Sequence, residues 1–97
     1  MAALDNVIKT LKENKNELSK EYNVKTVGIF GSYARGDCKK TSDVDILVEF
    51  KKTPSLFEFV ELKDHLSDLI GKNVDLVMKD ALRPNIGKHI MKEAVYV

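Results

Sequence analysis

The hydrophobic positions at the start of the chain recur with the period of a helix. Over residues 3–22, apolar side chains fall mostly three or four positions apart, with lysine, glutamate and asparagine between them. This spacing predicts one amphipathic helix over the whole range. Its apolar stripe consists of Leu4, Val7, Ile8, Leu11, Leu18 and Tyr22.

Three shorter segments are typical of β-strands. Residues 24–30 are rich in β-branched side chains and end at Gly31, and residues 73–79 are mostly apolar around Asp75. Residues 43–50 alternate, which predicts a strand with one apolar face. The apolar side carries Val44, Ile46, Val48 and Phe50, and the other side carries Asp43, Asp45, Leu47 and Glu49.

Capping signals place the remaining helices. Ser55 and Glu58 have the spacing of a capping box ahead of an apolar stripe that runs to Ile70, and Gly71 stands where a helix ends. Pro84 is expected to open a last helix. Its core positions are Ile86, Ile90, Met91 and Ala94. Residues 31–41 predict a turn or short helix, and residues 80–83 predict a turn. Residues 95–97 fit either a short edge strand or the end of the last helix.

The connections predict how the strands pair. The helix over residues 55–70 favours a parallel crossover between the second and third strands, whereas the shorter link between the first two allows an antiparallel pair. We therefore expect an α/β (α+β) fold with a small mixed sheet of three to four strands flanked by helices. A chain of 97 residues is expected to form one domain over residues 1–97.

Composition narrows the class of protein. Hydrophobic residues make up 43% of the chain and charged residues 32%, which is typical of a soluble globular protein. The net charge of +1 gives no argument for direct nucleic-acid binding. The single cysteine, Cys38, forms no internal disulfide, and from the residue pattern we expect neither a signal peptide nor a membrane span. We therefore expect a cytoplasmic protein.

Candidate chemistry is concentrated in acidic residues on the predicted strands. Asp43 and Asp45 project from one strand face, about 7 Å apart along the backbone. Carboxylates this close repel each other unless a cation lies between them, and Mg²⁺ prefers oxygen ligands. Asp75 is the only carboxylate of an otherwise apolar strand, and it could complete a two-metal site or act as a base. Each of these aspartates could also be an ordinary solvated residue.

A candidate phosphate-binding turn precedes these acids. Gly31 and Ser32 follow the first strand, so their backbone N–H groups could approach a phosphate, and Arg35 adds a positive charge nearby. The spacing fits neither a Walker A loop nor a dinucleotide-binding motif. If the first two strands are antiparallel and the third is parallel to the second, Gly31, Asp43, Asp45 and Asp75 meet at one end of the sheet.

Together, these residues also resemble a known family. The stretch GSYARGDCKKTSDVDILV (residues 31–48) is similar to the signature of the nucleotidyltransferase superfamily related to DNA polymerase beta, and nearly the whole chain resembles its minimal nucleotidyltransferases. The matching positions are Gly31, Ser32, Arg35, Gly36, Ser42, Asp43, Asp45 and Asp75.

The resemblance implies an enzyme that transfers AMP from ATP to an acceptor. Asp43, Asp45 and Asp75 would be catalytic and hold two Mg²⁺ ions, and the nucleotide would contact Gly31, Ser32, Arg35 and Ser42. The implied partner is a HEPN-domain RNase toxin, which the chain would silence as an antitoxin by adenylylating a tyrosine. The short chain leaves little room for an acceptor pocket, so we expect the acceptor site to arrive on another polypeptide.

Two other functions remain open. The chain could neutralise a toxin by binding alone, or it could form a dimer or other oligomer that modifies a small molecule.

Several other residues carry weaker expectations. Tyr33 could stack on a base or fill the turn, and Phe57 is a candidate partner contact. His65 and His89 are expected at the surface. No role is assigned to Cys38 or to the lysines around the second strand, which are Lys39, Lys40, Lys51 and Lys52.

Overall fold

A computed structural model describes residues 3–37, 39, 42–82 and 84–97. In chain order the elements are α1 (Ala3–Glu13), α2 (Lys15–Tyr22), β1 (Val24–Phe30), α3 (Ser32–Arg35), β2 (Val44–Phe50), α4 (Leu56–Ile70), β3 (Val74–Met78), the 3₁₀ turn η1 (Lys79–Ala81), α5 (Pro84–Glu93) and β4 (Val95–Tyr96). The sequence places the first three strands and α4 within one or two residues of these bounds.

The strands form one mixed sheet in the order β3-β2-β1-β4. β1 is antiparallel to β2 and to β4, while β2 and β3 are parallel. These are the predicted directions of the first three strands. The last residues of the chain form a short edge strand, since Gly28 pairs with Tyr96 and Ile29 with Val95.

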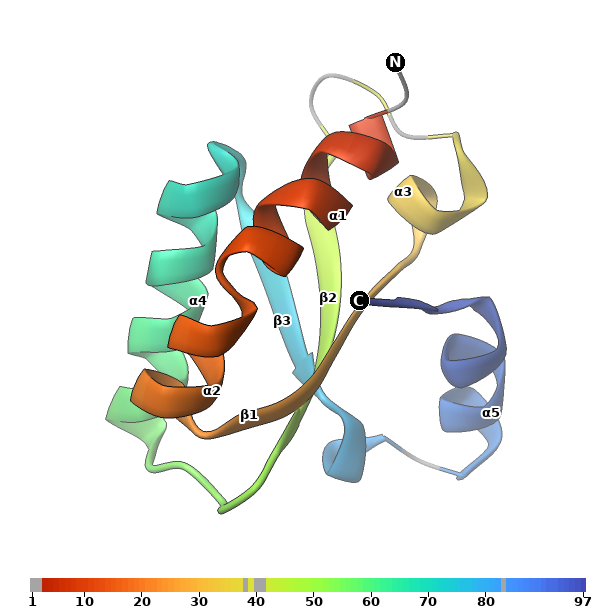
Figure 1. Ribbon diagram of the computed structural model, residues 1–97. Coiled ribbons are helices and arrows are strands. Elements are labelled where there is room, and N and C mark those ends of the chain that lie inside the picture. Colours follow the sequence, from red (N-terminus) through yellow and green to blue (C-terminus); the bar gives the residue numbers. More distant parts are fainter. Residues whose placement is uncertain (1–2, 38, 40–41, 83) are drawn as a thin grey trace.

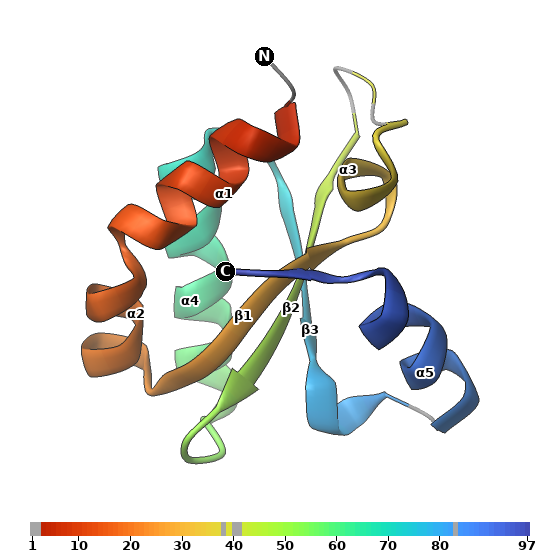
Figure 2. The ribbon, with the colours of Figure 1, turned by 45° about the vertical axis from the view of Figure 1, so that its right-hand side comes forward.

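The sheet separates two layers of helices (Figures 1 and 2). α1, α2 and α4 cover one face, and α5 lies on the other side. The main core lies under the three helices of the first face. It contains Val7, Leu11, Leu18, Val24, Val27, Ile29, Tyr33, Val44, Ile46, Val48, Leu62, Leu66, Val74 and Leu76.

The second face of β2 is not simply polar. Leu47, on the same side of the strand as Asp45, is only 1% exposed and does not belong to the main core cluster. The prediction of a single apolar face is therefore wrong at this position. The alternation along one strand shows which residues share a face, but not that a second layer covers that face.

The predicted first helix is in fact two helices. The helical pattern is interrupted at Asn14, where Nδ2 donates to the carbonyl oxygen of Thr10 at 2.8 Å. Asparagine side chains compete with the backbone for hydrogen bonds in this way. The apolar stripe continues through the break, because Leu11 and Leu18 are both buried.

The predicted capping box at the start of α4 is confirmed. The hydroxyl of Ser55 accepts from the N–H of Glu58 at 3.2 Å, and the carboxylate of Glu58 accepts from the N–H of Ser55 at 3.1 Å. At the other end Gly71 adopts the left-handed conformation and donates its N–H to the carbonyl of Ser67. The helix therefore begins and ends where local side chains satisfy its free backbone groups.

The last helix begins at Pro84, as predicted. Ile90 and Ala94 are half-buried, whereas the side chains of Ile86 and Met91 lie outside the described part of the structure. None of the helices in the described ranges is both long and apolar enough to cross a membrane.

Candidate active site

Three adjacent strands bring the predicted acidic residues together at one edge of the sheet. β1 ends at Phe30, which pairs with Asp45, and Asp45 pairs in turn with Asp75 on β3. Neighbouring strands are about 4.8 Å apart, so Gly31, Asp45 and Asp75 lie side by side. Asp43 immediately precedes β2 at the same edge. The predicted convergence of these residues is confirmed.

Gly31 contacts the carboxylate of Asp45. Its φ of 72° and ψ of −148° belong to a region that is essentially restricted to glycine. A Cβ on this residue would lie 2.1 Å from Oδ2 of Asp45. Glycine is therefore required here for its backbone conformation and also for the space that the carboxylate occupies.

Like charges surround Asp45. Partial burial raises the pKa of its carboxyl above the ordinary value, and the negative charges of Asp75, Asp43 and Glu93 raise it further. Arg35 acts in the opposite direction. The cluster thus holds a carboxylate whose ionised form is disfavoured until a cation approaches.

The donor set of this cluster suits a hard divalent cation. Asp43 and Asp75 are exposed, and with half-buried Asp45 they offer only carboxylate oxygens, the ligands that Mg²⁺ prefers. As the side chains stand, no three or more His, Cys, Asp or Glu residues within the described ranges converge closely enough to hold a metal ion.

The turn after β1 forms the short helix α3. The carbonyl of Gly31 accepts from the N–H of Arg35 at 3.1 Å, and the carbonyl of Ser32 accepts from the N–H of Asp37 at 3.0 Å. Tyr33 is 3% exposed and belongs to the core. Of its two predicted roles, the structure therefore supports filling the turn, and this anchor fixes Gly31 and Ser32 beside the acids.

Arg35 links this turn to the last helix. Its guanidinium contacts Glu93 Oε1 at 2.9 Å and Asp37 Oδ2 at 3.3 Å. Asp37, and more weakly Glu93, raise the pKa of Arg35. Glu93 is a part of the site that the sequence reasoning missed. Only the fold brings it within reach, because 58 positions separate it from Arg35.

Ser42 closes the turn that leads into β2. Its hydroxyl accepts from the N–H of Lys39 at 2.8 Å, and its own N–H donates to the carbonyl of Lys39 at 3.0 Å. The predicted contact of Ser42 with nucleotide stays a prediction.

The structure also describes several other residues that the sequence singled out. His65 is not merely a surface residue, because its ring stacks on Tyr22 at 5.2 Å and its Nε2 contacts Glu17, which joins α4 to α2. His89 is exposed, as expected, and Phe57 is 83% exposed. The ammonium of Lys51 donates to Ser19. Cys38 and Lys40 lie outside the described residues.

Comparisons with known proteins agree with this geometry. The profile of the family described as "Nucleotidyltransferase domain" matches residues 10–97. "Protein adenylyltransferase MntA" of Thermococcus cleftensis is 46% identical over 97 residues, which span 100% of this chain and 98% of that protein.

Solved structures share the fold. One, named "Structure of putative minimal nucleotidyltransferase", superposes with a TM-score of 0.80 at 30% identity, over 98% of this chain and 95% of that one. Another contains a tri-AMPylated Shewanella oneidensis HEPN toxin in complex with MNT antitoxin. It superposes with a TM-score of 0.61 at 21% identity, over 97% of this chain and 67% of that one. At that identity only the fold is compared.

The family profile spans nearly all of the chain, and the Thermococcus relative matches along its full length. The edge at which Gly31, Asp45 and Asp75 meet lies within the matched region. The chain therefore belongs to the nucleotidyltransferase domain family and is an enzyme of that type.

Proposed function

We propose that the chain transfers AMP from ATP to a tyrosine hydroxyl of a partner HEPN toxin and thereby acts as its antitoxin. The observation that carries this proposal is the position of Asp45, which lies against Gly31 and between two further acids. Residues 1–97 would form one nucleotidyltransferase domain that works in the cytoplasm, where ATP is available.

The reaction is a displacement at phosphorus. The acceptor oxygen forms a bond to the α-phosphorus of ATP, the bond from that phosphorus to the bridging oxygen breaks, and pyrophosphate leaves. The proton of the hydroxyl passes to a carboxylate at the edge of the sheet. We assign this role to Asp75, because it is exposed beside Asp45 and can reach an incoming acceptor.

Asp43, Asp45 and Asp75 would hold two Mg²⁺ ions. When bound, the ions would neutralise the phosphate oxygens and the charge that develops on them. The residues fit this role because a cation relieves what raises the pKa of Asp45, which is first its partial burial and then the negative charges of Asp75 and Asp43.

The turn after β1 would bind the triphosphate. The backbone of Gly31 and Ser32 lies beside the acids, and Ser42 carries a hydroxyl group, which can donate as well as accept. Arg35 is about half exposed, and a guanidinium has five N–H donors. It can therefore contact phosphate while it remains bound to Asp37 and Glu93.

The relatives support a protein acceptor. The Thermococcus relative is named a protein adenylyltransferase, and the Shewanella complex holds an AMPylated HEPN toxin with its antitoxin.

The test is the intact mass of a co-expressed HEPN toxin after incubation with this chain, ATP and Mg²⁺. We expect a gain of whole adenylate units, located by peptide mapping to tyrosine. The double variant Asp43→Asn plus Asp45→Asn should add none while it still folds. An unmodified toxin that is nevertheless neutralised in a stable complex would identify a binding antitoxin. Adenylylation of a small molecule by a homodimer would instead identify a small-molecule transferase.

A further inference from the structure

The side of α4 that faces solvent carries large apolar side chains at its start. Leu56 is 76% exposed, Phe57 is 83% exposed and Val60 is 45% exposed. With about 3.6 residues per turn, all three project away from Leu62 and Leu66, which α4 buries in the core. Single exposed apolar side chains are ordinary, but three side by side at one end of a helix form a patch that indicates an interaction surface.

The same side of α4 is acidic in its second half. Glu61, Asp64 and Asp68 are all exposed and stand three and four positions apart, so they continue the line that begins at Phe57. The ion pairs in the described part of the chain do not include these three carboxylates. We call this surface the α4 stripe. Its apolar half and its acidic half consist of Leu56, Phe57, Val60, Glu61, Asp64 and Asp68.

The acidic half lowers the stability of the free helix. Carboxylates three or four positions apart on a helix repel each other. Negative charge near the C-terminus of a helix also opposes the helix dipole. Asp68 stands in the last turn of α4, and that turn contains no basic residue. A positively charged ligand would relieve both effects, so the arrangement suits a surface that is covered by a cationic partner.

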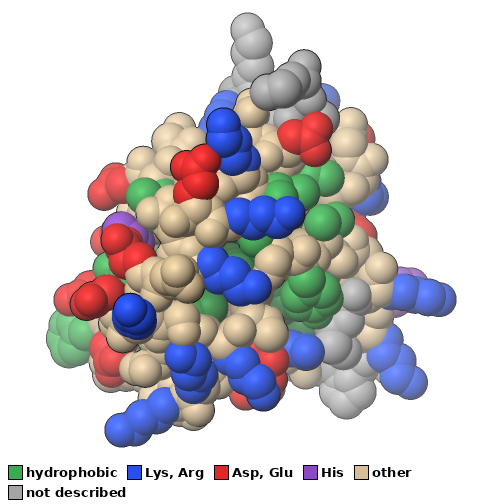
Figure 3. All heavy atoms as spheres, viewed as in Figure 1, with side chains coloured by type: hydrophobic (Ala, Val, Ile, Leu, Met, Phe, Trp, Pro, Cys, Tyr) green, Lys and Arg blue, Asp and Glu red, His purple; other side chains and the backbone are tan. Residues whose placement is uncertain are grey.

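Negative charge continues from α4 onto α2. Burial raises the pKa of Tyr22 on α2, and the charges of Glu61, Glu17 and Glu21 raise it further. Figure 3 shows Asp and Glu side chains gathered along the side of the molecule on which α2 and α4 lie in Figure 1. The α4 stripe is therefore bordered by acids although the whole chain carries a net charge of +1.

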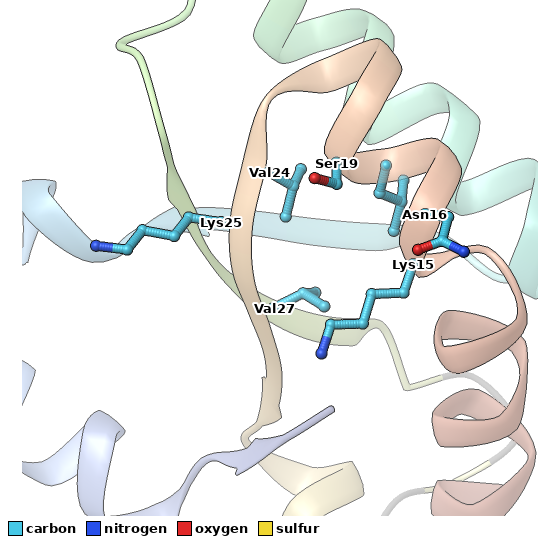
Figure 4. A pocket seen from close by; sticks show the side chains of 7 residues that line it. Lys15, Asn16, Ser19, Val24, Lys25 and Val27 are labelled. Carbon is cyan, nitrogen blue, oxygen red and sulfur yellow. The ribbon is translucent and has the colours of Figure 1, made fainter.

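A hollow of about 150 Å³ between α2 and β1 lacks such a pattern (Figure 4). The ammonium of Lys15 donates to the carbonyl of Val97 at 3.0 Å, and the side chain of Lys25 points away from the hollow. Neither lysine is placed to select a ligand there. The α4 stripe, by contrast, presents both its apolar and its charged side chains to solvent.

We propose that the α4 stripe docks an amphipathic helix of a partner protein. The apolar side chains of that helix pack on the apolar half of the stripe, and its Lys and Arg side chains face the acidic half. Packing between two helices supplies affinity, as in other helix-binding surfaces. Charge complementarity supplies selectivity. If the two helices run parallel, the basic residues of the partner also lie near its own C-terminus, where positive charge is favourable.

A second copy of this chain is the less suitable ligand. Two parallel α4 helices would bring their acidic halves face to face. Two antiparallel α4 helices would lay each apolar half on an acidic half, which buries carboxylates without cationic partners. An anionic membrane surface is disfavoured by the same acids. The charge pattern therefore favours a different, basic helix.

The apolar half of the stripe lies away from the edge of the sheet that holds Asp45 and Asp75. α4 starts beyond the far end of β2 and leads back to β3, which begins beside Asp75. Its 15 residues span about 22 Å. A helix docked on the stripe leaves the acidic edge open. The proposal therefore goes beyond adenylyl transfer and stands or falls separately from it.

The test uses the full chain, labelled with ¹⁵N, and a stapled, alanine-rich helical peptide. The peptide carries leucine along one face of its first half and lysine along the same face of its second half, and a matched peptide carries glutamate in place of lysine. We expect the lysine peptide alone to bind and to shift the amide resonances of residues 56–68.

Two variants of the acidic and apolar halves test the contacts. Asp64→Asn plus Asp68→Asn should weaken binding roughly tenfold, as loss of close charge pairs does, without lowering the midpoint of thermal unfolding. Glu13→Gln plus Asp80→Asn, the matched control at exposed positions of α1 and η1, should leave binding unchanged. Phe57→Ala should also weaken binding roughly tenfold. It should keep the fold intact, because this side chain is mostly exposed.

Several results would overturn the proposal. These are equal binding of both peptides, absence of binding, and binding that is insensitive to the variants of the stripe. Dimerisation of the chain that needs Phe57 and excludes the peptide would assign the stripe to a second copy. Binding to phosphatidylcholine vesicles that needs Phe57 would assign it to a membrane. Asp45→Asn should leave peptide binding unchanged, which separates docking from catalysis.

Discussion

At the scale of single residues, the site depends on how closely a carboxylate can approach a backbone. Gly31 and Gly36 both have positive φ, at 72° and 81°. Only Gly31 faces an obstacle, because an added Cβ would meet the carboxylate of Asp45, whereas nothing lies within 4 Å of one at Gly36. Alanine substitution at both positions therefore distinguishes two costs. Both variants pay the cost of the backbone conformation, but only the variant at Gly31 also has to displace Asp45.

We predict that Gly31→Ala abolishes adenylyl transfer and lowers the free energy of unfolding by about 1–3 kcal/mol, the cost of a residue held in this backbone region. Gly36→Ala, the matched control, should cost about 1–2 kcal/mol through its left-handed conformation and keep most of the activity. Denaturant unfolding and the toxin mass assay measure the two effects. Equal activity of the two variants would contradict a role for the Gly31–Asp45 contact.

Asp45 itself is predicted to destabilise the fold at neutral pH. The pKa of its carboxyl is raised in the folded state by burial and by Asp75 and Asp43, so the unfolded chain releases this proton first as pH rises. The free energy of unfolding therefore falls as the pH rises from the pKa of Asp45 in the unfolded chain to its higher pKa in the folded chain. It stays lower at every pH above that range. Below the unfolded pKa both states are protonated and the penalty is absent.

Asp45→Asn should therefore raise the free energy of unfolding at pH 7 by about 1 kcal/mol, a common gain when a functional group that costs stability is replaced. The gain should vanish in acid, and activity should be lost. Urea unfolding at several pH values measures it, with Asp80→Asn, an exposed residue of η1, as the control for removing one charge. A variant that is less stable than the wild type at pH 7 would refute the predicted penalty of the ionised Asp45.

The residues of the site differ in how visible they are in the sequence. Asp43, Asp45 and Gly31 could be found because they stand within 15 positions and share strand ends. The position of Asp75 beside the other acids could be predicted only if the third strand was parallel to the second, a direction that the length of the intervening helix favours. Glu93 could not be found, because only the packing of α5 brings it to Arg35, and a glutamate on a helix surface carries no local signal.

At the scale of elements, local capping determines where α4 begins. Ser55 and Glu58 exchange two hydrogen bonds at its first turn. We predict that Ser55→Ala lowers the free energy of unfolding by about 1 kcal/mol, the usual cost of losing an N-cap. Adenylyl transfer should be unchanged, because Ser55 follows the end of β2 that lies away from Asp45. Thr53→Ala, at a neighbouring exposed position, is the control, and thermal unfolding measures both.

The sequence predicts the elements whose ends are set by local signals, and it does not predict those that depend on contacts made in the fold. The bounds of α4 follow from a capping box and a C-terminal glycine, and those of β1 from a β-rich run that stops at Gly31. At Asn14 the backbone leaves helical geometry, with φ −106° and ψ 7°, and its side chain bonds to the carbonyl of Thr10, a local feature that the helical period does not encode. β4 exists because Gly28 and Ile29 offer an edge, so residues 95–97 alone could not decide between strand and helix.

At the scale of the whole molecule, ligand binding at the acidic edge should stabilise all of the fold. Asp45 and Asp75 stand on β2 and β3 and the proposed phosphate-binding turn follows β1, so a bound nucleotide and its cations would contact three of the four strands. The ion pair between Arg35 and Glu93 joins this edge to α5 as well. Global unfolding then requires the ligand to leave, and stability rises with its concentration.

We predict that ATP and Mg²⁺ together raise the midpoint of thermal unfolding. At ten times the dissociation constant a single ligand adds about 1.4 kcal/mol, which for a domain of this size corresponds to roughly 5–10 °C. Differential scanning fluorimetry measures the shift, with a non-hydrolysable ATP analogue to prevent turnover. With Mg²⁺ present, the variant Asp43→Asn plus Asp45→Asn should show less than a fifth of the wild-type shift in the unfolding midpoint. The variant Lys15→Gln plus Lys25→Gln should show the full shift. A shift that survives loss of both aspartates would place the nucleotide away from the acidic edge, and the transfer mechanism would then have to be rebuilt around other residues.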